Sequence, residues 1–155
     1  MCAPTSTAPA PKKAGEDHAI GRSRGGLSTK IHALVDALGK PIGFFLTGGK
    51  AHDLVGADHL LPTMAADTLI ADKALDAAER VLEPLAAAGK TAVIPPRANQ
   101  SSPRDYDRQL YGAHHLIENF FAKIKQFRAI AARYEKTARN FLAAVQLVAS
   151  VVWLN

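Results

Sequence analysis

Apolar and polar side chains alternate along two neighbouring stretches in the first third of the chain. Apolar residues recur at every second position in 29–35 and again in 42–46, and residues 36–41 (DALGKP) between them are of turn-forming types. Successive side chains of a strand point to opposite faces of a sheet, so this alternation predicts two strands that each bury one face. The short turn-rich link predicts that they form a hairpin.

Two shorter apolar runs, 68–71 (TLIA) and 91–94 (TAVI), are typical of strands buried on both faces. Asp72 directly follows the first run, and functional groups of mixed α/β sheets gather at the carboxyl ends of such strands. Asp72 is therefore a candidate site residue, although it is also an ordinary strand-terminating residue beside Lys73.

Helical spacing of apolar residues predicts helices over about 53–64, 76–88 and 136–153, and a long helix that carries Glu118 after the polar loop 97–104. Asp53 and Asp76 stand where helix N-caps are expected, and Gly89 stands where the second helix should end. For His52 and Asp53 we favour capping over catalysis. The last helix is expected to be buried, because the apolar run 141–154 is interrupted by polar residues and is short for a membrane span.

The first residues have a different composition. Residues 1–15 are rich in Pro, Ala, Ser and Thr without a periodic apolar face, which predicts a disordered lead-in over 1–20 before one domain at 21–155. Residues 21–26 (GRSRGG) form a flexible basic turn, in which backbone amides together with Arg22 and Arg24 could contact a phosphate. A plain solvated hairpin tip has the same composition.

Composition narrows the functional classes only slightly. A chain of 155 residues suits one domain with its own core, and a net charge of +5 favours an anionic partner without identifying it. The single cysteine, Cys2, permits no internal disulfide and fits a reducing compartment. No signal-like apolar run is present at the start, so we expect a cytoplasmic protein that is not secreted.

The stretch from Tyr111 to Lys125 contains several polar and ionisable side chains at helical spacing. At about 100° per residue, Tyr111, His114, Glu118 and Lys125 fall on one stripe of a helix, which holds a carboxylate between a phenol, an imidazole and an ammonium. A half-buried helix with a solvated polar edge would show the same spacing.

The order of these residues resembles the signature around the last catalytic carboxylate of DDE transposases of bacterial insertion sequences, with His114 where that family usually has Arg. The resemblance continues through 21–32 (GRSRGGLSTKIH), 71–76 (ADKALD), 93–97 (VIPPR) and 136–143 (KTARNFLA). It covers nearly everything after about residue 12. A modest departure lies near Leu75, where the family pattern has an aromatic residue.

The resemblance implies a ribonuclease H-like mixed sheet flanked by helices. It also implies DNA transposition by metal-dependent cleavage and strand transfer at insertion-sequence ends, with two Mg²⁺ (or Mn²⁺) ions held by Asp, Asp and Glu. Asp72 matches the second Asp and Glu118 the Glu, as catalytic residues and metal ligands. The expected DNA contacts are Arg22, Arg24, Tyr111, His114, Lys125 and Arg128.

The first Asp of that set has no counterpart. It belongs on a strand upstream of the GRSRGG turn, where residues 1–15 contain no acid, and Glu16, Asp17 and Asp36 are poor substitutes. We therefore expect the sheet to lack its first strand, which would leave unpaired backbone beside the hairpin and invite pairing with another chain. Cleavage by this chain alone should be weak or absent. The chain would then be the C-terminal portion of a transposase, either a remnant or the downstream of two reading frames, with an upstream half or a second copy as its partner.

Two other functions stay open. A non-catalytic DNA-binding remnant that inhibits intact transposase would use the same basic cluster, Lys123, Lys125, Arg128, Arg133, Lys136 and Arg139, which otherwise reads as a solvated face. A ribonuclease H-like nuclease unrelated to transposition accounts for the carboxylates but not for the Tyr111 to Lys125 pattern.

Overall fold

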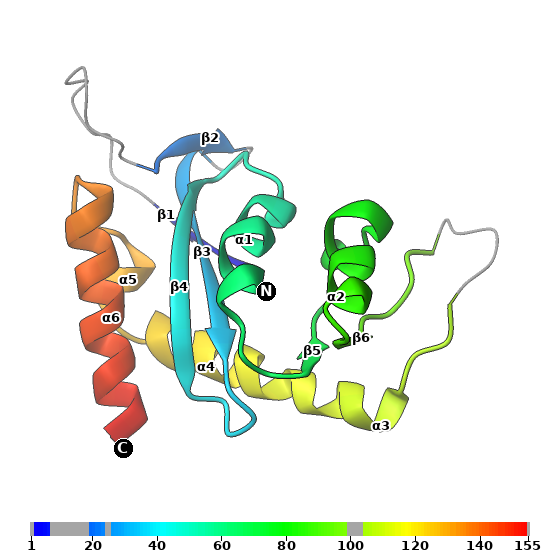
Figure 1. Ribbon diagram of the computed structural model, residues 1–155. Helices are drawn as coiled ribbons and strands as arrows, with labels where there is room; N and C mark the ends of the chain where they lie inside the picture. Colours follow the sequence, from blue (N-terminus) through cyan, green and yellow to red (C-terminus); the bar gives the residue numbers. More distant parts are fainter. Residues whose placement is uncertain (1, 7–18, 24–25, 99–103, 155) are drawn as a thin grey trace.

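A computed structural model describes residues 2–6, 19–23, 26–98 and 104–154, which form two sheets and a set of flanking helices (Figure 1). The larger sheet is antiparallel and centres on β3 (Gly26–Val35). β4 (Pro41–Gly48) pairs along one edge of β3, and β1 (Cys2–Ser6) and β2 (Gly21–Ser23) pair with it as well. The β3–β4 pair is the predicted hairpin, with a register irregularity between Leu34 and Val35.

The second sheet is small and parallel. β5 (Thr68–Ile70) pairs with β6 (Thr91–Val93) from Thr68↔Thr91 to Ile70↔Val93. The connection between them contains a π-helical segment (Ala78–Leu82) and α2 (Glu83–Ala87). Gly89 follows the end of α2, and its φ of +68° suits a residue without a Cβ. α1 (Asp53–Leu60) links the two sheets along the chain, followed by a 3-10 turn (Leu61–Thr63).

The remaining helices follow β6. They are α3 (Arg108–Tyr111), a 3-10 turn (Gly112–His114), α4 (His115–Lys125), α5 (Arg128–Ala131) and α6 (Ala138–Leu154). In Figure 1, α6 runs alongside β4 at one side of the molecule, and α4 crosses behind the lower parts of β3 and β4 and passes below β5. No helix in the described part of the chain is long and apolar enough to cross a membrane.

The apolar interior consists of two clusters. The first lies between the antiparallel sheet and helices α4 to α6, with Ile31, Leu46, Phe120, Phe121, Ile124, Ile130, Phe141 and Val145 among its buried members. The second joins α1, β5 and the segment around α2 through Leu54, Ala57, Leu69, Leu75, Val81, Leu85 and Ile94. The predicted mixed α/β class is confirmed, and the arrangement is consistent with a ribonuclease H-like fold.

The prediction of an unstructured lead-in is wrong for Cys2–Ser6. This segment pairs with β3 from Cys2↔His32 to Ser6↔Ser28, so a strand stands where none was expected. Its composition gave no signal because backbone pairing with an edge of β3 places this segment, and backbone pairing leaves no periodic pattern in the sequence. Residues 7–18, which include Glu16 and Asp17, lie outside the described residues.

Three further expectations about single elements need correction. His52, not Asp53, caps α1, because its Nδ1 accepts a hydrogen bond from the Leu54 N–H. Asp76 is not the N-cap of the next helical segment, which is Ala77; Asp76 is buried and accepts a hydrogen bond from the Arg97 N–H at 2.8 Å. α6 is only half buried, since Phe141, Val145 and Ala149 face the core while Leu147, Val151, Trp153 and Leu154 are exposed.

Arg133 does not belong to the solvated basic cluster in which the sequence placed it. Its side chain is buried, donates hydrogen bonds to Thr29 Oγ1 and to the carbonyls of Ala19 and Glu135, and lies over the Phe141 ring at 4.7 Å. The guanidinium therefore holds the sheet to α6, and the exposed members of the cluster are the other five residues.

Candidate active site

Asp72 reaches the candidate site from the end of β5. β5 and the buried Ala71 fix the backbone, and the Asp72 side chain turns back so that Oδ1 accepts a hydrogen bond from the Ala74 N–H at 2.8 Å. This turn leaves the carboxylate half-buried rather than fully solvated. The predicted position of Asp72 at a strand end is confirmed.

Tyr111, His114 and Glu118 meet on the opposite wall, where α3 passes through a 3-10 turn into α4. The Tyr111 and His114 rings are stacked, with centroids 5.1 Å apart and planes 13° from parallel. His114 Nδ1 lies 3.5 Å from Glu118 Oε1. The predicted grouping of these three side chains is therefore observed, although the helix that carries them is interrupted by a tighter turn.

Asp72 and Glu118 both act electrostatically on the rings of Tyr111 and His114. Burial lowers the pKa of His114, while Glu118 and Asp72 act in the opposite direction. Burial raises the pKa of Tyr111, and Asp72 and Glu118 raise it further. Near neutral pH Tyr111 therefore keeps its phenolic proton and His114 is uncharged.

A cleft of about 770 Å³ contains all four of these side chains. Its cationic lining residues are Lys30, Lys50, Lys73 and Arg97. A third carboxylate, Asp53, also lines it, but its Oδ1 accepts a hydrogen bond from Lys30 Nζ at 2.8 Å, and the same ammonium contacts the Ala51 carbonyl. Positive charges thus surround the carboxylates, as expected of a surface that receives a polyanion.

Sequence reasoning missed the cationic lining residues. Lys30 lies within 21–32 and Arg97 within 93–97, both of which are segments of the family resemblance, so those segments carried a usable signal. Lys50 lies before α1, outside the segments of the resemblance, so the sequence carried no signal for it. Their convergence depends on contacts between distant parts of the chain, which spacing along one helix cannot show.

The donor set of the cleft fits one divalent metal ion. Mg²⁺ in proteins is usually held by one or two carboxylates together with phosphate and water, and Asp72 and Glu118 supply two carboxylates. Within the described ranges, no three His, Cys, Asp or Glu side chains are grouped so that they could hold a metal ion by themselves.

Three of the other predicted DNA contacts lie outside the cleft. Lys125 and Arg128 are exposed at the end of α4 and the start of α5, and Arg22 is exposed on β2. Arg24 is outside the described residues. Asp36 accepts hydrogen bonds from the Leu38 and Lys40 N–H groups at the hairpin turn.

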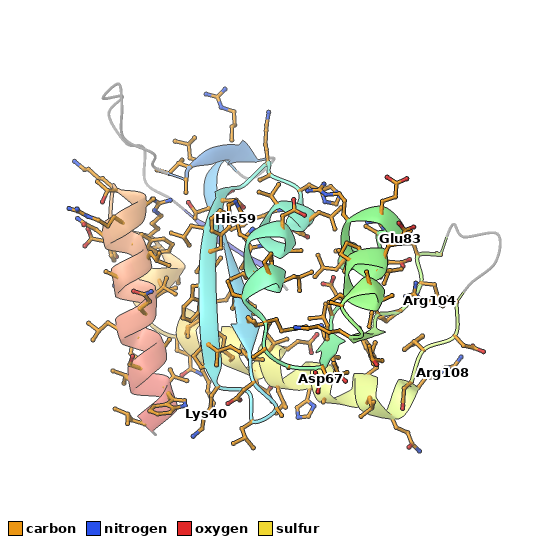
Figure 2. The ribbon with its side chains drawn as sticks, viewed as in Figure 1. Lys40, His59, Asp67, Glu83, Arg104 and Arg108 are labelled. Atoms are coloured by element: carbon orange, nitrogen blue, oxygen red, sulfur yellow. The ribbon has the colours of Figure 1, made fainter. Side chains whose placement is uncertain are left out.

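A second hollow, of about 510 Å³, adjoins the cleft. It lies between β3, α1, β5 and the start of α4, and it shares Asp53, Asp72 and His114 with the cleft. Asp67, just before β5, also lines it and is labelled in Figure 2. His114 Nε2 is buried and has no hydrogen-bond partner within the described part of the chain.

Comparison with known proteins gives consistent results. The profile of a protein family described as "Transposase DDE domain" matches residues 3–153. A protein of Brucella ovis named "Putative transposase for insertion sequence element IS6501" is 37% identical over 130 residues, which are 83% of this chain and 100% of that protein. No solved structure matches the chain.

Proposed function

This chain belongs to the family of DDE transposases of insertion sequences, and we propose that its cleft is the catalytic site, with Asp72 and Glu118 as the metal-binding carboxylates. The observation that carries the proposal is the convergence of these two residues with Tyr111 and His114 in a cation-lined cleft. The family acts on DNA, and we infer that the substrate is an insertion-sequence end, met in the cytoplasm on nucleoid DNA.

Members of this family use a divalent metal, which when bound would neutralise charge on the attacking and leaving oxygens of a phosphodiester. The chain's own contribution is to bind and orient the DNA. Lys30, Lys50, Lys73 and Arg97 attract backbone phosphates, and the protonated Tyr111 phenol can donate a hydrogen bond to a phosphate oxygen. His114 packs against Tyr111 and lies beside Glu118, so it holds both side chains in place.

His114 replaces a family Arg and cannot perform the same task. An imidazole offers no two-pronged donor for a phosphate, and burial disfavours its charged form. We assign it a positioning role beside the DNA rather than the strong phosphate contact that a guanidinium would make.

Among the residues that the structure describes, Asp72 and Glu118 are one carboxylate short of the three that two metal ions need. The residues of β1, Cys2–Ser6, include no acid, and Asp53 is engaged by Lys30. We propose that cleavage by this chain alone is weak, and that its partner is the product of an upstream reading frame or a second copy. Exposed Lys125, Arg128 and Arg22 would then follow the DNA backbone outside the cleft, and Arg24 stays a predicted DNA contact.

A second function follows from the same shortage. If no partner completes the site, the chain binds insertion-sequence ends without cutting them and so competes with intact transposase. This alternative predicts DNA binding that is strong at low salt and independent of Glu118.

The test is nicking and strand transfer on end-bearing DNA with Mg²⁺ or Mn²⁺, for the chain and for Glu118→Gln. The matched control is Glu83→Gln, an exposed carboxylate on α2 that lies outside the cleft (Figure 2). Metal-dependent nicking that is lost only in Glu118→Gln supports the catalytic proposal. Binding of all three proteins without nicking supports the competitor. Absence of DNA binding overturns both.

A further inference from the structure

The turn that carries Asp72 is a very short helical segment. Asp72 is the N-cap of a 3-10 turn (Lys73–Leu75), and its Oδ1 accepts a hydrogen bond from the Ala74 N–H at 2.8 Å. A 3-10 segment of three residues has poor internal hydrogen bonding, and the carbonyls at its end need donors from elsewhere. The orientation of the Asp72 carboxylate therefore depends on what fixes the carbonyl end of the turn.

Arg97 supplies two donors to that end. Its Nε donates to the Lys73 carbonyl at 3.3 Å, and its Nη2 donates to the Ala74 carbonyl at 3.1 Å. The guanidinium is a rigid planar fork, so one side chain can bond two successive carbonyls. Ala74 is bonded on both sides, because its N–H donates to Asp72 and its carbonyl accepts from Arg97. A movement of the Arg97 side chain would reach Asp72 through this one residue.

A buried carboxylate fixes the main chain of Arg97. The Asp76 side chain is 0% exposed, its Oδ2 accepts a hydrogen bond from the Arg97 main-chain N–H at 2.8 Å, and its Oδ1 lies 3.4 Å from Arg104 Nη1. Arg104 Nη2 donates to the Ile94 carbonyl at 2.9 Å. Because Asp76 bonds the main chain of Arg97, a substitution of the Arg97 side chain removes the fork and leaves this anchor in place.

Arg97 could act in the cleft in two ways, which make different demands on its side chain. A group that only attracts phosphate needs a positive charge, and a lysine would serve. The contacts with Lys73 and Ala74 need two donors in a fixed fork, which an ammonium cannot provide. A positive charge alone would also repel a metal ion from the cleft, whereas a fixed Asp72 carboxylate would favour its binding.

We propose that Arg97 is a positioning residue for Asp72. Its guanidinium caps the 3-10 turn at the carbonyl end, and the capped turn holds the Asp72 carboxylate in one orientation at the cleft. Arg97 acts through Ala74 and does not itself contact the metal ion. The benefit to metal binding rests on the proposed function, whereas the capping of the turn does not.

The first measurement is amide hydrogen exchange by NMR, without DNA or metal, for the unmodified chain, Arg97→Gln and Arg97→Lys. Exchange at Ala74 should accelerate about tenfold in both variants, because its bond to Asp72 opens more often once the turn loses its cap. The matched controls are Lys73→Gln, which removes a cleft cation and keeps the fork, and Arg108→Gln, an exposed arginine on α3 (Figure 2). Both controls should leave exchange at Ala74 unchanged.

The second measurement is the dissociation constant for Mn²⁺ without DNA, from the electron paramagnetic resonance signal of the free ion. Loss of a group that orients a metal ligand weakens metal binding roughly 10–100-fold, so Arg97→Gln and Arg97→Lys should both bind Mn²⁺ at least about tenfold more weakly. Lys73→Gln removes a positive charge and should bind Mn²⁺ no more weakly than the unmodified chain. The direction of the change separates the two roles, because removal of a mere cation would strengthen metal binding.

Thermal unfolding followed by circular dichroism reports the fold of each variant, and Arg97→Lys decides if Arg97→Gln does not fold. Unchanged exchange at Ala74 overturns the cap. Faster exchange with equal or tighter Mn²⁺ binding overturns the positioning of Asp72, and so does full rescue by Arg97→Lys. An unmodified chain that binds no Mn²⁺ overturns the proposed metal site, and exchange at Ala74 then still decides whether Arg97 fixes the turn.

Discussion

His32 is a histidine held uncharged inside the protein. Its ring lies between β3 and α1, with Nε2 at 2.8 Å from Thr47 Oγ1, and burial lowers its pKa from 6.5 to about 4 against the opposing effect of Asp53. The alternation of side chains over 29–35 places His32 on the face of the strand opposite to that of Ile31 and Ala33. Its burial follows from α1 covering that face, which the alternation of residues in β3 alone does not show.

Acid should destabilise the fold through His32. Between pH 6.5 and about 4 the unfolded chain binds a proton at this residue that the folded chain excludes, so the free energy of unfolding falls as pH is lowered through that window. Denaturant unfolding at a series of pH values should show a weaker pH dependence for His32→Gln than for the unmodified chain. Equal slopes for the two proteins would contradict the assignment.

Asp76 anchors the segment after β6. Its carboxylate is buried, accepts a hydrogen bond from the Arg97 N–H at 2.8 Å and lies 3.4 Å from Arg104 Nη1. Asp76→Ala would leave these donors without their acceptor, so we expect a loss of about 2–4 kcal/mol in the free energy of unfolding. Asp58→Ala removes an exposed partner of Arg80 and should cost less than about 1 kcal/mol. Similar losses from both, measured by urea titration, would contradict the anchoring role.

At the scale of elements, α1 sits on β3 at a point where only glycine fits. A Cβ on Gly56 would overlap the His32 ring, whereas a Cβ on Gly112 would meet nothing within 4 Å. In a helix Ala is normally favoured over Gly by about 1 kcal/mol. Gly56→Ala should instead destabilise the protein by about 1–3 kcal/mol, because α1 or His32 must move. Gly112→Ala should be neutral or stabilising in the same thermal unfolding experiment, and a stabilised Gly56→Ala would show that α1 packs differently.

The elements that the sequence predicted well are those with a regular apolar period. The hairpin of β3 and β4, the short strands β5 and β6, and the amphipathic α4 all follow from such patterns. β1 could not be predicted because Cys2–Ser6 are ordered by pairing with β3, and the burial of Arg133 depends on contacts with residues more than a hundred positions away. In the candidate site, helical spacing gave Tyr111, His114 and Glu118, whereas Lys50 came only from the folded arrangement.

At the scale of the whole molecule, positive charges lie both in the cleft and at the exposed Lys125 and Arg128. Each phosphate contact lowers the slope of log K against log[salt] by about 0.9. The double variant Lys125→Gln with Arg128→Gln should therefore bind DNA more weakly and make the slope less negative by about 1 to 2. Arg80→Gln, which removes a cation paired with Asp58 and outside the cleft, should leave the slope unchanged. Anisotropy titrations of labelled duplex over a range of salt concentrations measure both, and an unchanged slope in the double variant would exclude these two residues from the DNA contact.

The two separate core clusters have a consequence for the carboxylates. Asp72 lies between Ala71 and Leu75, which belong to one cluster, and Glu118 lies beside Ile117 and Phe120, which belong to the other. The spacing of the two carboxylates is therefore set by how two half-molecules rest on each other and not by the rigidity of a single sheet. If Asp72 and Glu118 hold an ion as proposed, the ion would stabilise the contact between the two clusters. Separation of the clusters would then release the ion before either cluster unfolds.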